Sequence, residues 1–394
     1  MSLYKNRTTA LILLSLVFFG FKSNLNAQSH VTGKFGKGIS FLAQDSSYSV
    51  KMGFRFQTLY TGTYNETSEA WSEDLIIRRS RLKFDGYVFD PSVVYKLELG
   101  LSNRDTQSGS VSESGNTSNI ILDAALKWTF AKNWTLWVGQ TKLPGNRERV
   151  ISSQNLQFVD RSQLNSRFNL DRDIGIQLHH KFNVGKVVIK DIYAISTGEG
   201  RNVIVKNPKN GKEYTARVEI LPFGNFTNKG DYFGSDLARE KDPKLSIGIT
   251  GDYNHNAGRT RGNLGSFKYV GSDPLVSSLK TLFVDAMFKW NGVSVESEYV
   301  NRNSSDKVAS FGYGTAFTAS LGYLFKNNIE LAGRYTTLSP ISTYSSIAEA
   351  SEYAVGFSKY IVGHSLKFQS DVSYTDQKVG ANFYRIRFQF ELAL

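Results

Sequence analysis

The sequence predicts an all-β protein, a transmembrane antiparallel β-barrel of about 16 strands with short periplasmic turns and long outer loops. Three observations support this fold class. Segments of roughly ten residues alternate between apolar and polar side chains and are separated by turns. The chain contains 27 Phe, 20 Tyr and 34 Gly but only 7 Pro, which suits aromatic strands joined by tight turns. After the first 27 residues no run of about 18 apolar residues occurs, so no transmembrane helix is expected.

The first 27 residues are expected to form a secretory signal peptide. Lys5 and Arg7 provide a positive start, the apolar run 10–21 follows, and the segment ending at Ala27 offers a cleavage site. This apolar run is too short to span a bilayer, and its terminal position argues against a buried helix of a soluble domain. Residues 28–47 then form a periplasmic N-terminal segment, and residues 48–394 form the barrel.

The last segment shows the alternation clearly. Its apolar face consists of Tyr384, Ile386, Phe388, Phe390, Leu392 and Leu394. Its polar face consists of Arg385, Arg387, Gln389 and Glu391. Sixteen such strands are expected, centred near residues 54, 81, 97, 125, 138, 177, 191, 217, 250, 285, 298, 319, 333, 355, 370 and 388. A β-sandwich or propeller is the soluble alternative, but its strands average only about five or six residues.

The connections between these strands alternate in length. Short turns include Asn291-Gly292, whose two residues tolerate the positive φ of a type I′ hairpin turn. Long polar connections are expected at 61–74, 103–118, 142–171, 197–211, 256–279, 303–313 and 338–349. This alternation of short and long connections is typical of a barrel with both termini on the periplasmic side. One connection at the periplasmic end, 222–243, is unexpectedly long.

The charge balance favours anionic partners. The chain has 47 Lys and Arg; the signal peptide removes three of these and no acid, leaving 44 against 35 Asp and Glu, a net charge of +9. An exported protein rarely meets nucleic acid, so small anionic solutes or a lipopolysaccharide-like surface are the better candidates. The absence of cysteine excludes disulfides and thiolate metal sites, and no cofactor is expected.

Basic residues are expected to line the lumen. Around residues 77–87, alternation directs Ser80, Leu82 and Phe84 to lipid and the neighbouring charged side chains inward. The expected anion pathway on the lumen wall is Arg55, Arg79, Arg81, Lys83 and Lys96. The loop 142–171 is the candidate constriction, with Lys142, Arg147, Arg149, Arg161 and Arg167. Alternatively these cations are solvated, or pair in wall-to-loop salt bridges, since Asp123, Asp285, Glu296, Glu298 and Glu330 also face inward.

Several blocks resemble the phosphate-selective porin O and P family in its Bacteroidetes-type form. They include residues 77–82, 137–144 and 217–224, within a resemblance that spans about 36–394. The resemblance implies a sixteen-stranded outer-membrane porin of a Gram-negative bacterium, a homotrimer with one loop folded into the lumen. Together with the basic lumen it predicts a diffusion porin for small hydrophilic solutes, preferring anions, with phosphate selectivity left open.

Other functions fit the sequence less well. A non-conducting barrel acting as an adhesin or as a scaffold of an envelope complex is the main alternative. An energised receptor would need a large N-terminal plug domain. Catalysis is not expected, because His179 and His180 are more simply interfacial residues near a membrane edge, and Glu296 with Glu298 is more simply lumen lining.

Overall fold

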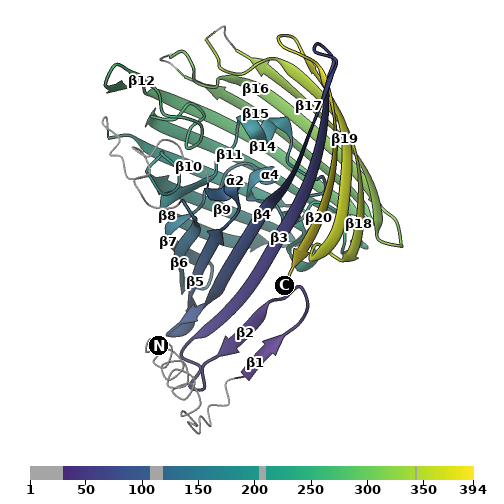
Figure 1. Ribbon diagram of the computed structural model, residues 1–394. Helices are drawn as coiled ribbons and strands as arrows, with labels where there is room; N and C mark the ends of the chain where they lie inside the picture. Colours follow the sequence, from purple (N-terminus) through teal and green to yellow (C-terminus); the bar gives the residue numbers. More distant parts are fainter. Residues whose placement is uncertain (1–29, 107–118, 204–209, 305, 307, 342–343) are drawn as a thin grey trace, which may run out of the picture.

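The computed structural model describes residues 30–106, 119–203, 210–304, 306, 308–341 and 344–394 (Figure 1). The predicted signal peptide, 1–27, lies outside the described residues. No helix in the described ranges is long and apolar enough to cross a membrane.

Sixteen antiparallel strands form a closed barrel (Figure 1). They are β3 (Ser49–Asn65), β4 (Ala70–Val88), β5 (Asp90–Gly100), β6 (Ile121–Ala131), β7 (Trp134–Lys142), β8 (Arg172–Val184), β9 (Val187–Ser196), β10 (Lys212–Leu221), β11 (Lys244–Ala257), β14 (Ser277–Trp290), β15 (Val293–Asn303), β16 (Gly314–Leu324), β17 (Ile329–Pro340), β18 (Ala350–Val362), β19 (Leu366–Gln377) and β20 (Phe383–Ala393). Closure comes from β20 pairing with β3, from Ala393 opposite Arg55 to Phe383 opposite Asn65. Every expected strand centre falls inside one of these strands, so the predicted fold class is confirmed.

One predicted loop is wrong. The connection expected at 61–74 is strand for most of its length, because β3 and β4 run for 17 and 19 residues and only 66–69 join them. Register continues to Tyr64 opposite Trp71. Trp71 also covers Gly62, where an added Cβ would lie 2.2 Å from the indole ring. The residues of this hairpin are mostly polar and lack the alternation of a lipid-facing strand, so the sequence predicts a loop. The two strands nevertheless stay paired beyond the apolar band of the barrel.

The short-turn end of the barrel carries both ends of the described chain. A hairpin of β1 (His30–Gly33) and β2 (Ile39–Leu42) pairs with the first residues of β3, and Leu394 bonds to the carbonyl of Phe54. In bacterial barrels this end faces the periplasm. The opposite end carries the longer loops, including α2 (Asn103–Thr106) and a hairpin of β12 (Tyr269–Val270) and β13 (Asp273–Pro274). Of the loop predicted at 103–118, residues 107–118 lie outside the described part.

The outer wall is apolar and the inner wall is polar. Val355, Leu321 and Ile176 are more than half exposed on the outside. Their strand neighbours on the other parity point inward and are buried, as with Glu352 and Ser358 on β18. This alternation is what a wall with lipid on one side and protein or water on the other requires.

We expect Val355→Arg, near the middle of β18, to destabilise the folded barrel by about 2–4 kcal/mol, because it puts a charge into lipid. Val355 is 67% exposed. The matched control is Val379→Arg, since Val379 is 79% exposed but lies in the connection between β19 and β20. Urea unfolding in lipid vesicles measures both. Equal costs for the two variants would contradict the assignment of the outer wall to lipid.

The hydrophobic core lies inside the barrel and not between layers. Leu143, Leu164, Phe168 and Leu170, from the connection between β7 and β8, pack against inward side chains of the wall. The wall residues of this cluster are Ala194, Phe283, Val300, Ala316, Leu338 and Ala350. The connection 143–171 is therefore fixed to the inner wall, and it shapes the space that remains.

Candidate ion pathway

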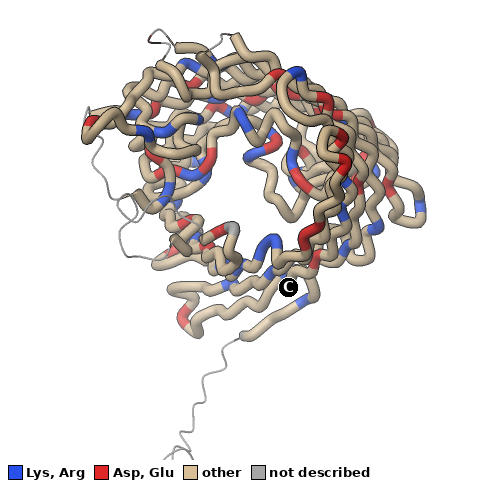
Figure 2. The backbone as a smooth tube through the Cα atoms, turned by 45° about the horizontal axis from the view of Figure 1, so that its top comes forward, with Lys and Arg blue, Asp and Glu red and all other residues tan. Residues whose placement is uncertain are grey.

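Residues 143–171 fold into the lumen and carry two short helices, α4 (Arg147–Val150) and α5 (Gln163–Arg167). Figure 2 shows chain inside the ring of strands. Arg147 is fully buried: its Nε donates to Asp285 at 2.7 Å and its Nη2 to Ser246 at 2.8 Å and to Glu219 at 3.3 Å. A buried guanidinium with two carboxylate partners is a strong anchor. It ties α4 to β10, β11 and β14.

A second set of bonds ties the same loop to the far wall. Lys367 on β19 donates from Nζ to the carbonyls of Gln154 at 2.8 Å and Leu156 at 3.2 Å. The amide N–H of Val159 donates to Asp371 at 3.2 Å. Gln157 donates to Glu330 at 2.8 Å. These bonds hold one side of the loop to β10, β11, β14, β17 and β19, and a free space lies on its other side.

That space is a cavity of about 410 Å³ between the loop and the wall of β4, β5, β7 and β8. Its cationic lining residues are Arg78, Arg79, Arg81, Lys83, Lys96, Lys142, Arg149, Arg161, Arg172 and Arg201. Its acidic lining residues are Glu98, Asp105 and Asp171. Ten cations against three carboxylates make it a strongly positive compartment.

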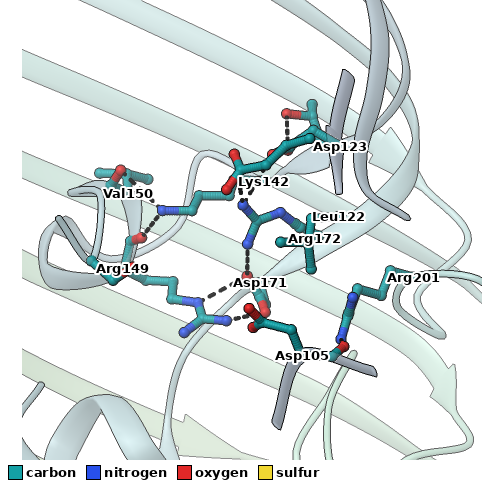
Figure 3. A network of polar contacts seen from close by, with 12 residues as sticks. Asp105, Leu122, Asp123, Lys142, Arg149, Val150, Asp171, Arg172 and Arg201 are labelled. Atoms are coloured by element: carbon teal, nitrogen blue, oxygen red, sulfur yellow. Dashed lines mark hydrogen bonds and ion pairs between the residues drawn. The ribbon is translucent and has the colours of Figure 1, made fainter. Parts of the chain in front are cut away.

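Ion pairs neutralise only part of this charge. Six of the ten cations lie within 4 Å of a carboxylate, shared among Glu98, Asp105, Asp123, Asp160 and Asp171. Figure 3 shows part of this network, in which Arg172 bridges Asp123 and Asp171 and Arg149 pairs with Asp171. The other four, Lys83, Lys142, Arg161 and Arg201, have no such partner among the described residues. Counting all five carboxylates, the basic side chains of this compartment still outnumber the acidic ones by five.

Three of these four cations are held by backbone carbonyls. Lys142 donates from Nζ to Arg149 O at 2.7 Å, Val150 O at 3.3 Å and Ile151 O at 3.2 Å (Figure 3). Arg161 donates to Ile151 O and to Glu148 O, both at 2.7 Å. Both therefore interact with the negative, carbonyl end of α4. Carbonyl dipoles fix these cations in place without cancelling their charge. Arg201 likewise bonds to the carbonyls of Asp105 and Asn119, whereas Lys83 makes no hydrogen bond within the described ranges.

The structure brings together seven of the predicted residues and separates three. Arg79, Arg81, Lys83 and Lys96 on the wall, and Lys142, Arg149 and Arg161 on the loop side, line one cavity. Arg55 is buried beside Ser153 and Glu391 and does not line the cavity. Arg147 is the buried anchor described above. Arg167 is exposed at the end of α5, away from the cavity.

Three further arginines line the cavity that the sequence did not predict there: Arg78, Arg172 and Arg201. Arg78 has the parity of Ser80 and Leu82, which predicts a lipid-facing side chain. A register shift between Gln57 and Thr58 leaves Arg78 as a bulge, and its guanidinium turns inward to Asp160 at 2.7 Å. Strict alternation would place the Arg78 side chain in lipid, which is energetically costly, and this cost is a sequence signal for a bulge at that position.

The loop carboxylates also give the pathway a defined response to acid. Although burial raises the pKa of Asp160, Arg78 and Arg79 hold it well below its usual value, and Arg149 and Arg172 do the same for Asp171. A lowered pKa in the folded state stabilises the loop above the ordinary Asp pKa of about 3.9, and this stabilisation is lost only as pH falls through the lowered value. We expect conductance to stay constant from about pH 7 to about pH 5, with loop release only below the ordinary Asp range. Single-channel noise that rises between those two values would contradict this anchoring.

A closed barrel with an apolar outer wall and a charged lumen narrowed by an inner loop defines an outer-membrane porin. The chain belongs to the phosphate-selective porin O and P family, whose model matches residues 50–306. The predicted family and the location in the outer membrane of a Gram-negative bacterium are thereby confirmed. The family is one of channel proteins, and no group of three or more potential metal ligands occurs in the described residues.

Solved structures share the fold at low sequence identity. An anion-selective porin from Comamonas acidovorans has a TM-score of 0.55 and 11% identity, over 88% of this chain and 100% of that one. OprB of Pseudomonas putida has a TM-score of 0.55 and 9% identity, over 89% and 95%. A loop L8 deletion mutant of OmpT from Vibrio cholerae has a TM-score of 0.53 and 11% identity, over 88% and 99%. No curated protein matches the chain.

Proposed function

We propose that this porin passes small hydrophilic solutes with a preference for anions, and that ions follow the basic wall of β4, β5, β7 and β8. The observation that carries the proposal is the cavity with ten cations, four of which lack a carboxylate partner. Fixed charges of one sign in a narrow wet path raise the local concentration of the opposite ion. The solved structure of an anion-selective porin with the same fold is consistent with this function.

Phosphate is the finer possibility. Guanidinium groups bind oxyanions through paired N–H donors and stay charged at physiological pH. Arg79, Arg81 and Arg161 lie around one cavity and supply such groups. Their donors are already engaged by carboxylates or carbonyls, however. We therefore propose general anion preference as the main function and phosphate affinity as a modest addition to it.

A planar bilayer experiment tests the proposal. The reversal potential of the purified protein across a KCl gradient should indicate chloride over potassium. Adding phosphate at constant ionic strength should reduce chloride current only weakly, whereas strong block by low phosphate would establish phosphate selectivity. A potassium-selective potential would refute the anion preference. Stable barrels that never conduct would instead favour the adhesin or scaffold function.

We also propose that residues 1–27 are removed on export, that 28–47 stay in the periplasm, and that the protein assembles as a homotrimer in contact with outer-membrane lipid and lipopolysaccharide. A structure of OmpT in its trimer form shares the fold, with a TM-score of 0.51 and 12% identity. Mass spectrometry of the exported chain and of the detergent-extracted assembly tests both parts. An intact N-terminus or a monomer would contradict the corresponding part.

A further inference from the structure

The connection between β10 and β11, residues 222–243, packs against the inner wall of the barrel and the inner loop. We call it the floor strap. It contains a 3₁₀ segment, η1 (Thr227–Tyr232), and begins and ends at the periplasmic end of the wall. Its Phe226 is buried in a cluster with Ile151 and Leu156 of the inner loop and Val188, Leu221 and Met287 of the wall. The strap therefore folds up into the lumen and meets the inner loop.

A buried lysine fixes the strap to the wall. Lys289 on β14 is 1% exposed, and its Nζ donates to the carbonyls of Gly230 at 2.8 Å, Phe233 at 2.9 Å and Ser235 at 2.8 Å. All three protons of the ammonium group are thus used by one short stretch of backbone. At the other end of the strap, Arg239 donates to the carbonyl of Leu324 at 2.7 Å, and this bond connects the strap to the end of β16.

The strap and the inner loop also bond to each other. The amide N–H of Gly234 donates to Asn155 O at 2.7 Å. Arg147 Nη1 donates to Asp231 O at 2.9 Å, and Lys190 on β9 pairs with the Asp231 carboxylate at 2.6 Å. The two segments enter the lumen from opposite ends, and they join into one partition.

The part of the lumen behind the partition differs from the basic cavity in its ionisable side chains. Glu298 and Glu330 face the lumen from β15 and β17, are 1% exposed and have no cation within 4 Å in the described part of the chain. Their hydrogen bonds come from neutral groups, including Asn146 and the amide N–H of Glu148 for Glu298, and Gln157 and Tyr360 for Glu330. Glu296 lies beside them on the same inner face, also without a cationic partner there. This half of the lumen therefore contains carboxyl groups without a cationic partner, and burial without such a partner favours their neutral form. The basic wall instead contains cationic side chains without a carboxylate partner.

We propose that the floor strap is a selectivity determinant: it closes the acidic half of the lumen at the periplasmic end and confines ions to the basic wall. Without it, water would reach the carboxyl groups of β15 and β17 from the periplasm, and hydration would allow them to ionise. A second path lined by acids would then open and would favour cations. The inference rests on the proposed anion preference, and its test separates the two.

The first measurement leaves the partition intact. The chain has no cysteine, so single cysteines report access without background. Ser320, on β16, lines a small space of about 30 Å³ beside Glu296 and Gly234, between the partition and the wall. Ser152 lines the basic cavity. A trimethylammonium thiosulfonate added from the periplasmic side should leave Ser320→Cys unmodified, while a sulfonate analogue modifies Ser152→Cys. Equal modification of the two cysteines would overturn the sealing role.

The second measurement releases the strap. Lys289→Met removes the three bonds to the strap carbonyls, and replacement of residues 225–240 by an Asn-Gly turn removes the strap. Both should raise single-channel conductance, the shortened strap at least about twofold, and should shift the reversal potential toward potassium. Lys326→Met is the control, because Lys326 is exposed in the turn between β16 and β17. Heat-dependent gel mobility verifies that each barrel is folded.

The outcomes are distinguishable. If the wild-type protein prefers chloride but the strap variants keep its conductance and selectivity, the strap proposal fails and the anion preference stands. If the wild-type protein does not prefer chloride, the proposed function fails, and modification of Ser320→Cys alone decides whether the strap seals the acidic half. If neither strap variant folds, the same labelling of the otherwise wild-type chain decides.

Discussion

Lys83→Glu is expected to lower the chloride-over-potassium permeability ratio by about fivefold or more. Lys83 lines the basic cavity and, although Glu98 lies opposite it in the strand register, has no ion pair within 4 Å and no hydrogen bond in the described residues, so no bonded partner neutralises its charge. A unit charge at about 4 Å contributes on the order of 1 kcal/mol in a water-like medium, which corresponds to about fivefold, and reversal changes two units. The effect should fall at high salt because the charges are screened.

Reversal potentials in a KCl gradient measure the ratio. Lys326→Glu makes the same change in net charge in an exposed periplasmic turn and should leave the ratio within error of wild type. If both variants shift the ratio equally, net charge decides selectivity and the basic wall does not. If neither variant shifts it, ions do not pass Lys83.

Arg147→Ala should destabilise the barrel by about 3 kcal/mol and make the open channel noisier. The substitution leaves Asp285 and Glu219 buried with one fewer cation, and breaking a buried pair costs about 3–5 kcal/mol. Arg217 continues to pair with both carboxylates, which places the loss at the lower end of that range. The same change removes the bonds that tie α4 to the wall and to the floor strap, so the inner loop should fluctuate.

Urea unfolding in vesicles and single-channel recordings measure the two effects. Arg167→Ala is the control within the same loop, because Arg167 is exposed and should change stability by less than about 0.5 kcal/mol. An Arg147→Ala variant as stable and as quiet as the control would show that the loop is held by other contacts.

The barrel could be predicted from the sequence because lipid imposes a local rule. Each strand must present apolar side chains at every second position, as Tyr353 and Val355 do on β18, and this rule is visible without knowing any partner. The rule fails where it does not apply. It does not predict the ends of β3 and β4 near residues 65 and 70, where the hairpin carries mostly polar side chains. It also predicts that Arg78 faces lipid, because a bulge there adds one residue and shifts the alternation.

The site could be predicted only in part, because charge alone does not say which cations are neutralised. Lys83 and Arg147 look equivalent in the sequence, yet one is unpaired in the cavity and the other is buried between Asp285 and Glu219. Asp285 lies 138 residues from Arg147, so no local pattern links them. The floor strap was visible as an unusually long connection. Its role depends on Lys289 reaching three carbonyls far away in the chain, which no spacing reveals.

The most direct measurement compares two thiol reagents at one cysteine. Ser152→Cys places a thiol in the basic cavity without removing a charge, in a chain that has no other cysteine. We expect an anionic sulfonate thiosulfonate to modify it at least about tenfold faster than a trimethylammonium analogue, and to reduce the chloride current as it reacts. The difference should shrink at high salt. Faster modification by the cationic reagent, or modification that leaves the current unchanged, would contradict an anion path along the basic wall.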